Sequence, residues 1–230
     1  MKCIIGYKNY NLDINNSPTF GIRTKIGVLM SNWIITPDKY LSSDEIKQLK
    51  RTLSEIAVLG KSKGNQAPVR DCLIISIALN TGLRVSELSN LKVQDLHLKR
   101  GQNSIVVRKG KGDKNRIVAF GPKLKSQIAE YLKYRMSDSE YLFPSERREK
   151  LSRSGIQKIF KKIAKKAKLA KHYSIHCLRH TYATQIYKSS GYNLRLVQQQ
   201  LGHASITTTS VYSHVDNQQI EEAISSLEEE

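Results

Sequence analysis

Hydrophobic residues recur at helical spacing from residue 41 onward, with polar residues between them. The residues that share one face of the first such segment are Ile46, Leu49, Leu53 and Ile56. This spacing predicts an amphipathic helix. The preceding Ser42-Ser43-Asp44-Glu45 has the pattern of a capping box, with Ser42 as N-cap and Glu45 three residues later. We therefore expect a folded domain to begin near Leu41.

The next segments predict one central helix and one β-hairpin. Residues 72–79 are apolar almost all round, which is typical of a buried helix, and Pro68 is the expected start of that helix. Thr81-Gly82 should end it. Apolar β-formers at 105–107 and 117–120 flank the turn-rich segment KGKGDKN, a pattern that predicts an antiparallel hairpin.

Further helices are expected along the rest of the chain, at 85–91, 122–136, 152–168 and from an N-cap at Ser174 to about Tyr187. The fold class is therefore mainly α with a small antiparallel β-sheet. Residues 1–40 show no sustained period, although a strand near Ile26–Met30 is compatible with them. The pattern divides the chain into a lead-in at 1–40, a main domain at 41–215 and a tail at 216–230.

Charge changes this picture by indicating a polyanionic partner. The 230 residues include 38 Lys plus Arg and 20 Asp plus Glu, for a net charge of +18. Residues 41–215 hold 33 of the basic and 12 of the acidic residues, a net charge of +21. Such a field attracts DNA or RNA. A solubilising basic surface or a ribosome-associated protein is the alternative on charge alone.

The remaining composition argues against several classes. The 39% hydrophobic and 25% charged fractions fit a globular protein rather than a disordered one. No apolar run is long enough for a membrane span, and no secretory signal is visible at the N-terminus. Cys3, Cys72 and Cys177 are odd in number and far apart, which favours reduced thiols. We expect a soluble, cytoplasmic protein.

Candidate chemistry concentrates in four segments: 81–88, 109–114, 176–184 and 201–212. Arg84 follows a glycine at a helix end, while His176 and Arg179 share one helical face because they are three residues apart. Two arginines from separate elements can hold the oxygens of one phosphate through paired N–H bonds. Lys111, flanked by glycines at a hairpin tip, is a candidate proton donor. No magnesium-binding carboxylate cluster, phosphate-binding glycine loop or Ser-His-Asp pattern accompanies these residues.

Cutting a phosphodiester without metal or an activated water requires a nucleophile from the protein. Tyr212 lies nine residues after His203, and its hydroxyl becomes reactive where positive charge or a base favours the phenolate. Tyr187 and Tyr192 compete for this role, although packing explains them more simply. His172, His176, Cys177 and His180 suggest a zinc site as an alternative, but no acidic residue accompanies them.

These segments, from about Leu41 to His214, resemble the tyrosine recombinases, the family of phage integrases and Xer-like site-specific recombinases. The resemblance implies the DNA breaking-rejoining catalytic fold for residues 41–215. It also implies the catalytic residues, which are Arg84, Lys111, His176, Arg179, His203 and Tyr212, with Glu87 and His180 in supporting positions. Basic residues expected at DNA are Lys109, Lys114, Lys158, Lys161, Lys162, Lys165 and Lys166.

The resemblance further implies cleavage and rejoining of double-stranded DNA at a specific site through a 3′-phosphotyrosyl intermediate, with no metal, ATP or other cofactor. The tail has the pattern of a short acidic amphipathic helix, with an apolar stripe of Ile220, Ala223, Ile224 and Leu227. In the resembled family this segment links subunits, which implies a tetramer on paired sites.

The short lead-in departs from the family pattern. Members usually carry a helical DNA-grasping domain of about a hundred residues before the catalytic domain, and only 40 residues precede Leu41 here. A minimal recombinase, a decayed copy and a trimmed catalytic domain all fit. A type IB topoisomerase and a non-catalytic DNA-binding protein remain alternatives, although the acidic tail disfavours the first and the filled catalytic positions disfavour the second.

Overall fold

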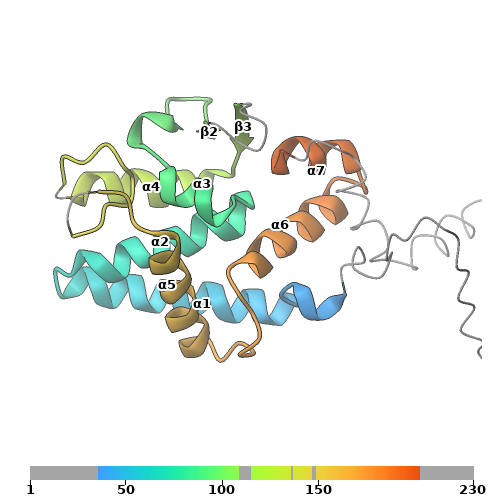
Figure 1. The fold of residues 1–230 in the computed structure, drawn as a ribbon, viewed down its shortest axis with the longest axis horizontal. Helices are drawn as coiled ribbons and strands as arrows, with labels where there is room; N and C mark the ends of the chain where they lie inside the picture. Colours follow the sequence, from blue (N-terminus) through green and yellow to red (C-terminus); the bar gives the residue numbers. More distant parts are fainter. Residues whose placement is uncertain (1–35, 109–114, 136, 147–148, 203–230) are drawn as a thin grey trace, which may run out of the picture. The chain divides into compact units, whose positions relative to one another are not determined.

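The computed structural model describes residues 36–108, 115–135, 137–146 and 149–202 (Figure 1). The chain divides into two units, Met1–Trp33 and Ile34–Glu230, and all described residues belong to the second. The strand predicted at 26–30 and the tail helix predicted at 216–230 both lie outside the described residues.

Helix α1 (Ser43–Ser62) begins as the sequence predicts. The Ser42 hydroxyl accepts a hydrogen bond from the Glu45 backbone N–H at 3.3 Å, and the Glu45 carboxylate accepts one from the Ser42 N–H at 2.9 Å. This reciprocal pair is a capping box, which confirms the prediction. Ile46, Leu49 and Leu53 are buried on the face that packs against α2.

Helix α2 (Gln66–Thr81) is the central element, in contact with α1, α4, α5 and α6 (Figure 1). Its predicted start at Pro68 is wrong by two residues. The Asn65 side chain caps the helix by accepting from the Ala67 N–H at 3.1 Å, which leaves Pro68 inside the first turn, where its missing N–H costs nothing. The helix ends at Gly82 in the left-handed conformation (φ +63°), as predicted.

The sheet has three antiparallel strands in the order β1 (Leu96–His97), β2 (Ser104–Val107) and β3 (Arg116–Ala119). Val107 pairs with Arg116 and Ser104 with Ala119, so the predicted hairpin is confirmed. Strand β1 was not predicted, because two residues are too few to show an alternating pattern.

Five more α-helices follow: α3 (Val85–Asn90), α4 (Pro122–Tyr134), α5 (Arg153–Lys166), α6 (His176–Ser189) and α7 (Leu194–Leu201). Two short 3-10 helices, Pro37–Lys39 and Val93–Asp95, complete the described fold. The predicted N-cap of α6 at Ser174 is wrong. Ile175 occupies that position without a side-chain cap, and Ser174 contributes its backbone carbonyl, which accepts from the Cys177 N–H at 2.9 Å. The architecture is mainly helical with a small sheet, as the sequence indicates.

The buried residues form one large cluster around α2 and a smaller one between α6 and α7. The smaller cluster consists of Tyr182, Ala183, Tyr187, Val197 and Leu201, and Tyr40 packs against it. The Leu41 N–H also donates to the Thr181 hydroxyl at 2.9 Å, so the start of the described chain is attached to α6. Within the described residues, no helix has the length and apolar character that a membrane span requires.

Candidate functional site

The turn after α2 places Arg84 at the beginning of α3. Gly82 allows this turn, because a Cβ there would lie 2.6 Å from a ring carbon of Tyr182 and 2.8 Å from a methyl group of Leu201. Arg84 is half-buried, with 28% of its side chain exposed. The guanidinium is thus carried by a turn that is packed against both α6 and α7.

Glu87, one turn into α3, holds Arg84 in place. Its carboxylate accepts from Nη1 of Arg84 at 3.0 Å and from the Arg84 backbone N–H at 2.7 Å. The same carboxylate accepts two further bonds from Arg116, at 2.8 and 2.9 Å. Burial alone would raise the pKa of this carboxyl, but the hydrogen bonds and charge of Arg116, with the backbone N–H and charge of Arg84, outweigh it and hold the pKa below its usual value. Glu87 thus contacts Arg84 directly, and its supporting role in catalysis stays a prediction.

Arg116 belongs to this cluster and was missed by the sequence analysis. It begins β3, two residues after the end of the basic segment 109–114, where another arginine looks like one more phosphate contact. Its Nε also donates to the Gln200 carbonyl at 3.3 Å, near the end of α7. Nothing in the local pattern identifies a partner on α3 or α7, since both lie far away in the sequence.

Arg179 on α6 is buried, with 8% exposure. Its Nη1 donates to the Gly82 carbonyl at 2.6 Å, and its Nη2 donates to the Leu201 carbonyl at 2.9 Å. The guanidinium therefore lies between the turn that carries Arg84 and the last residue of α7. Tertiary packing brings the two predicted arginines into one region, although about 95 residues separate them in the chain.

The two predicted histidines of α6 differ in environment. His176 is exposed at the start of the helix, whereas His180 is half-buried one turn later. Burial lowers the pKa of His180 to about 4, and the charges of Arg179 and His176 act in the same direction. The His180 imidazole is therefore neutral at pH 7, which fits a supporting position rather than a charged phosphate contact.

This environment predicts that His180 makes the fold sensitive to acid. The unfolded chain binds a proton on His180 near pH 6.5, and the folded chain does so only near pH 4. Its contribution to stability is thus complete above about pH 6.5 and decreases as the pH falls towards 4. Relative to His180→Gln, the wild type should lose about 2 kcal/mol of unfolding free energy between pH 7.5 and pH 5. Urea unfolding of both proteins at the two pH values measures this difference; parallel losses would contradict it.

Five predicted residues lie outside the described part of the chain: Lys109, Lys111, Lys114, His203 and Tyr212. Two described residues that adjoin these segments in sequence, Gly202 before His203 and Arg116 after segment 109–114, lie in contact. Helix α7 ends at Gly202 (φ +65°), where a Cβ would lie 2.5 Å from Cδ of Arg116. The residue before His203 is therefore in close contact with the first residue of β3.

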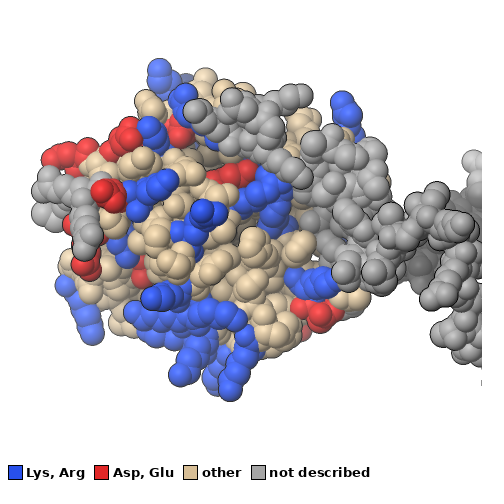
Figure 2. All heavy atoms as spheres, in the orientation of Figure 1, with Lys and Arg blue, Asp and Glu red and all other residues tan. Residues whose placement is uncertain are grey.

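The predicted DNA-binding lysines of α5 are exposed, and Figure 2 shows Lys and Arg gathered over the region of this helix. Lys161 differs from Lys158, Lys162, Lys165 and Lys166. Its ammonium donates to the carbonyls of Lys171 and Tyr173, at 2.8 and 2.6 Å. It ties the loop after α5 to the helix, so it has a structural function in addition to any contact with DNA.

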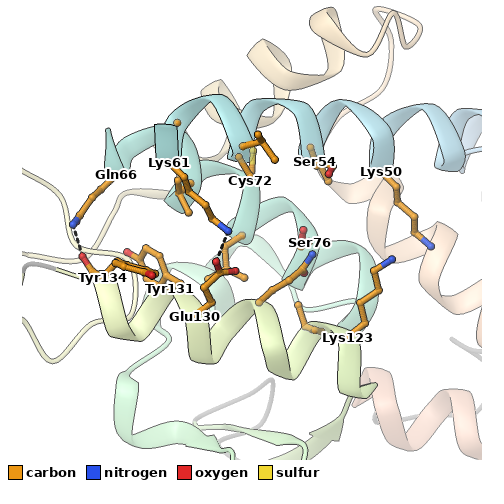
Figure 3. Close-up of a pocket in the computed structure, with 18 of the residues that line it drawn as sticks. Lys50, Ser54, Lys61, Gln66, Cys72, Ser76, Lys123, Glu130, Tyr131 and Tyr134 are labelled. Carbon is orange, nitrogen blue, oxygen red and sulfur yellow. Dashed lines mark hydrogen bonds and ion pairs between the residues drawn. The ribbon is translucent and has the colours of Figure 1, made fainter. Parts of the chain in front are cut away.

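A cavity of about 550 Å³ lies between α1, α2 and α4 (Figure 3). Its floor is apolar, and the ion pair between Lys61 and Glu130 spans it at 2.6 Å. The described residues that line it include none of the residues predicted to act on phosphate. The arginine cluster is therefore separate from this cavity.

The alternative sites find little support among the described residues. Cys177 is buried, and burial raises the pKa of its thiol to about 12. Across the described ranges, no group of three or more His, Cys, Asp or Glu side chains is arranged to hold a metal ion. Tyr187 is buried and its ring meets that of Tyr192 edge-on at 5.3 Å between centroids, which is a packing arrangement.

Comparison with known proteins gives a consistent result. Residues 39–219 match the phage integrase family. The tyrosine recombinase XerA of Pyrococcus furiosus is 38% identical over 192 residues, which cover 82% of this chain and 62% of the relative. A crystal structure of XerA recombinase has a TM-score of 0.66 at 34% identity and covers 84% of this chain and 63% of that one. XerH site-specific recombinase, in a post-cleavage complex with a palindromic difH substrate, has a TM-score of 0.68 at 31% identity, over 82% of this chain and 53% of that one. The chain spans less than two thirds of the length of these relatives.

Proposed function

Because the chain belongs to the phage integrase family of tyrosine recombinases, we propose that it cleaves and rejoins double-stranded DNA at a specific recombination site. The XerH relative is described in complex with its recombination substrate. The strongly basic composition of residues 41–215 supports the same class of partner.

In the proposed reaction, a neighbouring base takes the proton of the Tyr212 hydroxyl, the phenolate oxygen attacks a DNA phosphorus, and the bond from phosphorus to the 5′ oxygen breaks. Lys111 gives a proton to the departing 5′ oxygen, and the 3′ phosphate remains esterified to the tyrosine. A 5′ hydroxyl from a partner strand then attacks the phosphotyrosine and releases Tyr212. The number of phosphoester bonds is conserved, so the reaction needs no ATP.

The guanidinium groups of Arg84 and Arg179, with His176 and His203, are proposed to stabilise the charge on the pentavalent phosphate. The observation that carries this proposal is the bond from Arg179 to the Gly82 carbonyl, two residues before Arg84. It fixes two arginines from separate elements in one region, as binding of a single phosphate requires.

The proposal is tested by incubating the protein with nicked duplex DNA enriched from a random-sequence pool for binding to it. A nick beside the scissile phosphate lets the short fragment diffuse away, so a covalent intermediate accumulates. We expect a protein–DNA adduct that persists in EDTA and without ATP. Failure to form an adduct on tightly bound duplexes, or an adduct that needs a divalent metal, would contradict the proposed reaction.

The exposed lysines of α5 are proposed to bind the DNA backbone. Each phosphate neutralised contributes a slope of about −0.9 to the plot of log K against log salt, and on the order of 6–10 phosphates is plausible for this charge. Changing Lys158, Lys162, Lys165 and Lys166 to Gln should make the slope shallower by about 0.9 for each phosphate that is no longer neutralised, without slowing adduct formation at low salt. A matched variant changes four exposed lysines of α1 and α4 to Gln, namely Lys47, Lys50, Lys123 and Lys133. An equal change in slope for both variants would mean that α5 is not specifically at the DNA.

The tail is proposed to link protomers into a tetramer on paired sites. A helix as short as 216–227 is marginal alone and needs a surface on which to bury its apolar stripe. Deleting residues 216–230 should leave binding to a single site intact or stronger while abolishing complexes that contain two sites, as measured by sedimentation velocity. Paired-site complexes that form equally well without the tail would show that it has no such function.

A further inference from the structure

We infer that Arg116 is a positioning residue for the cleavage reaction: it holds the Glu87 carboxylate that orients Arg84, and it attaches β3 to the end of α7. This inference rests on the proposed function, because it concerns the geometry of the phosphate-binding arginines. It adds a residue that the sequence-predicted catalytic set does not include.

The first observation is that each of the three guanidinium nitrogens of Arg116 donates a hydrogen bond within the protein. Nη1 and Nη2 bind the two oxygens of Glu87 at 2.8 and 2.9 Å, and Nε binds the Gln200 carbonyl at 3.3 Å. Only 12% of the Arg116 side chain and 8% of the Glu87 side chain are exposed. A paired, bidentate contact of this kind fixes both partners in orientation as well as distance. Arg116 is thus held in place by contacts within the protein.

The second observation is that Arg84 has the complementary arrangement. It gives one guanidinium N–H to Glu87, at 3.0 Å, and among the described residues no other acceptor binds its guanidinium. With 28% of its side chain exposed, Arg84 keeps N–H groups available to an external phosphate. The two arginines therefore contact the same carboxylate in different ways: Arg116 holds it through two hydrogen bonds, and Arg84 binds it through one side-chain N–H and keeps other donors exposed.

The charge balance explains why both arginines are needed. Glu87 carries one negative charge and shares it between two guanidinium groups. If Arg116 were lost, the buried carboxylate would have Arg84 as its single cationic partner. The Arg84 guanidinium would then turn further towards Glu87, and its donors would be less available to a pentavalent phosphate.

The third observation is the place of Arg116 in the chain. It is the first residue of β3, close behind the segment that contains Lys111, and it touches the end of α7, just before His203. Its aliphatic part lies against Gly202, where any Cβ would come within 2.5 Å of Cδ. One side chain thus connects α3, β3 and α7, which in sequence adjoin the predicted catalytic residues Arg84, Lys111 and His203 respectively.

The experiment compares wild type, Arg116→Gln and Arg116→Lys for the single-turnover rate of adduct formation on the nicked duplex and for the Kd of that duplex. We expect Arg116→Gln to form the adduct about 10–100-fold more slowly, with a Kd close to that of wild type. Arg116→Lys should recover part of the rate because it restores the positive charge beside Glu87 without the bidentate geometry.

Arg70→Gln is the matched control for loss of a partly buried arginine. Arg70 pairs with Asp71 at 2.8 Å and donates to the Pro144 carbonyl at 3.4 Å, so these partners include neither Glu87 nor Gln200. Arg70→Gln should leave the rate of adduct formation unchanged. Thermal unfolding of each variant gives the fraction that is folded at the assay temperature, so that rates are compared for equal amounts of folded protein. A double-mutant cycle with Glu87→Gln then tests whether Arg116 acts through Glu87. If it does, the fold-loss in rate of the double variant is smaller than the product of the fold-losses of the two single variants.

The outcomes separate the two proposals. If wild type forms no adduct, the proposed function fails and this inference fails with it. If wild type forms the adduct and folded Arg116→Gln matches its rate, this inference alone is overturned. A rate loss that is fully explained by a weaker Kd would make Arg116 a DNA contact, which also overturns it, as would fully independent effects of Arg116→Gln and Glu87→Gln.

Discussion

Replacing Tyr212 by Phe should abolish the covalent protein–DNA adduct while leaving DNA affinity within about twofold of wild type. The substitution removes one hydroxyl oxygen, which is the proposed nucleophile, and keeps the ring. The expected loss is complete, because a Phe ring has no oxygen with which to form the ester. Denaturing gel electrophoresis of labelled nicked duplex, beside a mobility-shift titration, measures both quantities.

Tyr192→Phe is the matched control for this experiment. Tyr192 also follows α6 in the chain and is half-exposed, with its ring against Tyr187. Its hydroxyl should be dispensable for the adduct. If Tyr212→Phe still formed the adduct and Tyr192→Phe did not, Tyr192 would be the nucleophile and the proposed role of Tyr212 would be wrong.

Arg84→Gln should lower the single-turnover rate of adduct formation by about 10²–10³-fold, the usual cost of removing one donor that stabilises developing charge. The described contacts of Arg84 are few, so the variant should fold. Arg84→Lys should be nearly as slow, since an ammonium cannot reproduce the planar fork that binds two phosphate oxygens. The measurement is the rate at saturating duplex, where a change in affinity has no effect.

Arg179 is a useful contrast to Arg84. Its guanidinium binds two backbone carbonyls and is buried, so Arg179→Gln should reduce both the rate and the stability of the fold. Arg84→Gln should reduce the rate alone. Equal rates for Arg84→Gln and wild type would show that Arg84 does not contact the phosphate and that the arginine cluster serves the fold only.

The predictions from sequence that the structure confirms depend on local interactions. The capping box at Ser42 and Glu45 joins residues three positions apart, and the glycine at the end of α2 is selected by its own backbone conformation. The hairpin of β2 and β3 follows from alternating residues beside a turn-rich segment. His176 and Arg179 fall on one helix because their spacing matches a helical turn. Such features are encoded within a few residues, so they can be read before the fold is known.

The local errors have equally local causes. Pro68 is a favoured first residue of a helix, but the side chain of Asn65 caps α2, so the helix begins at Gln66, two residues before Pro68. Ser174 is a favoured cap by residue type, and yet its carbonyl rather than its hydroxyl is used. Residue type alone does not determine which of two adjacent caps the packed chain adopts. The roles predicted for Lys111, His203 and Tyr212 stay predictions, since these residues lie outside the described ranges.

Residue type and short spacing were enough to predict the family, the helical class, the basic surface and the candidates Arg84 and Arg179. The groups that these two arginines contact, and the presence of Arg116 beside them, follow from the tertiary structure alone. Arg179 reaches the Gly82 and Leu201 carbonyls, and Arg116 reaches Glu87 and Gln200, across chain separations of 22 to 97 residues. A guanidinium carries the same charge and donors wherever it stands. Its partners are set by the packing of α2, α6 and α7, and that packing holds Arg116 and Arg179 by internal acceptors while 28% of the Arg84 side chain stays exposed.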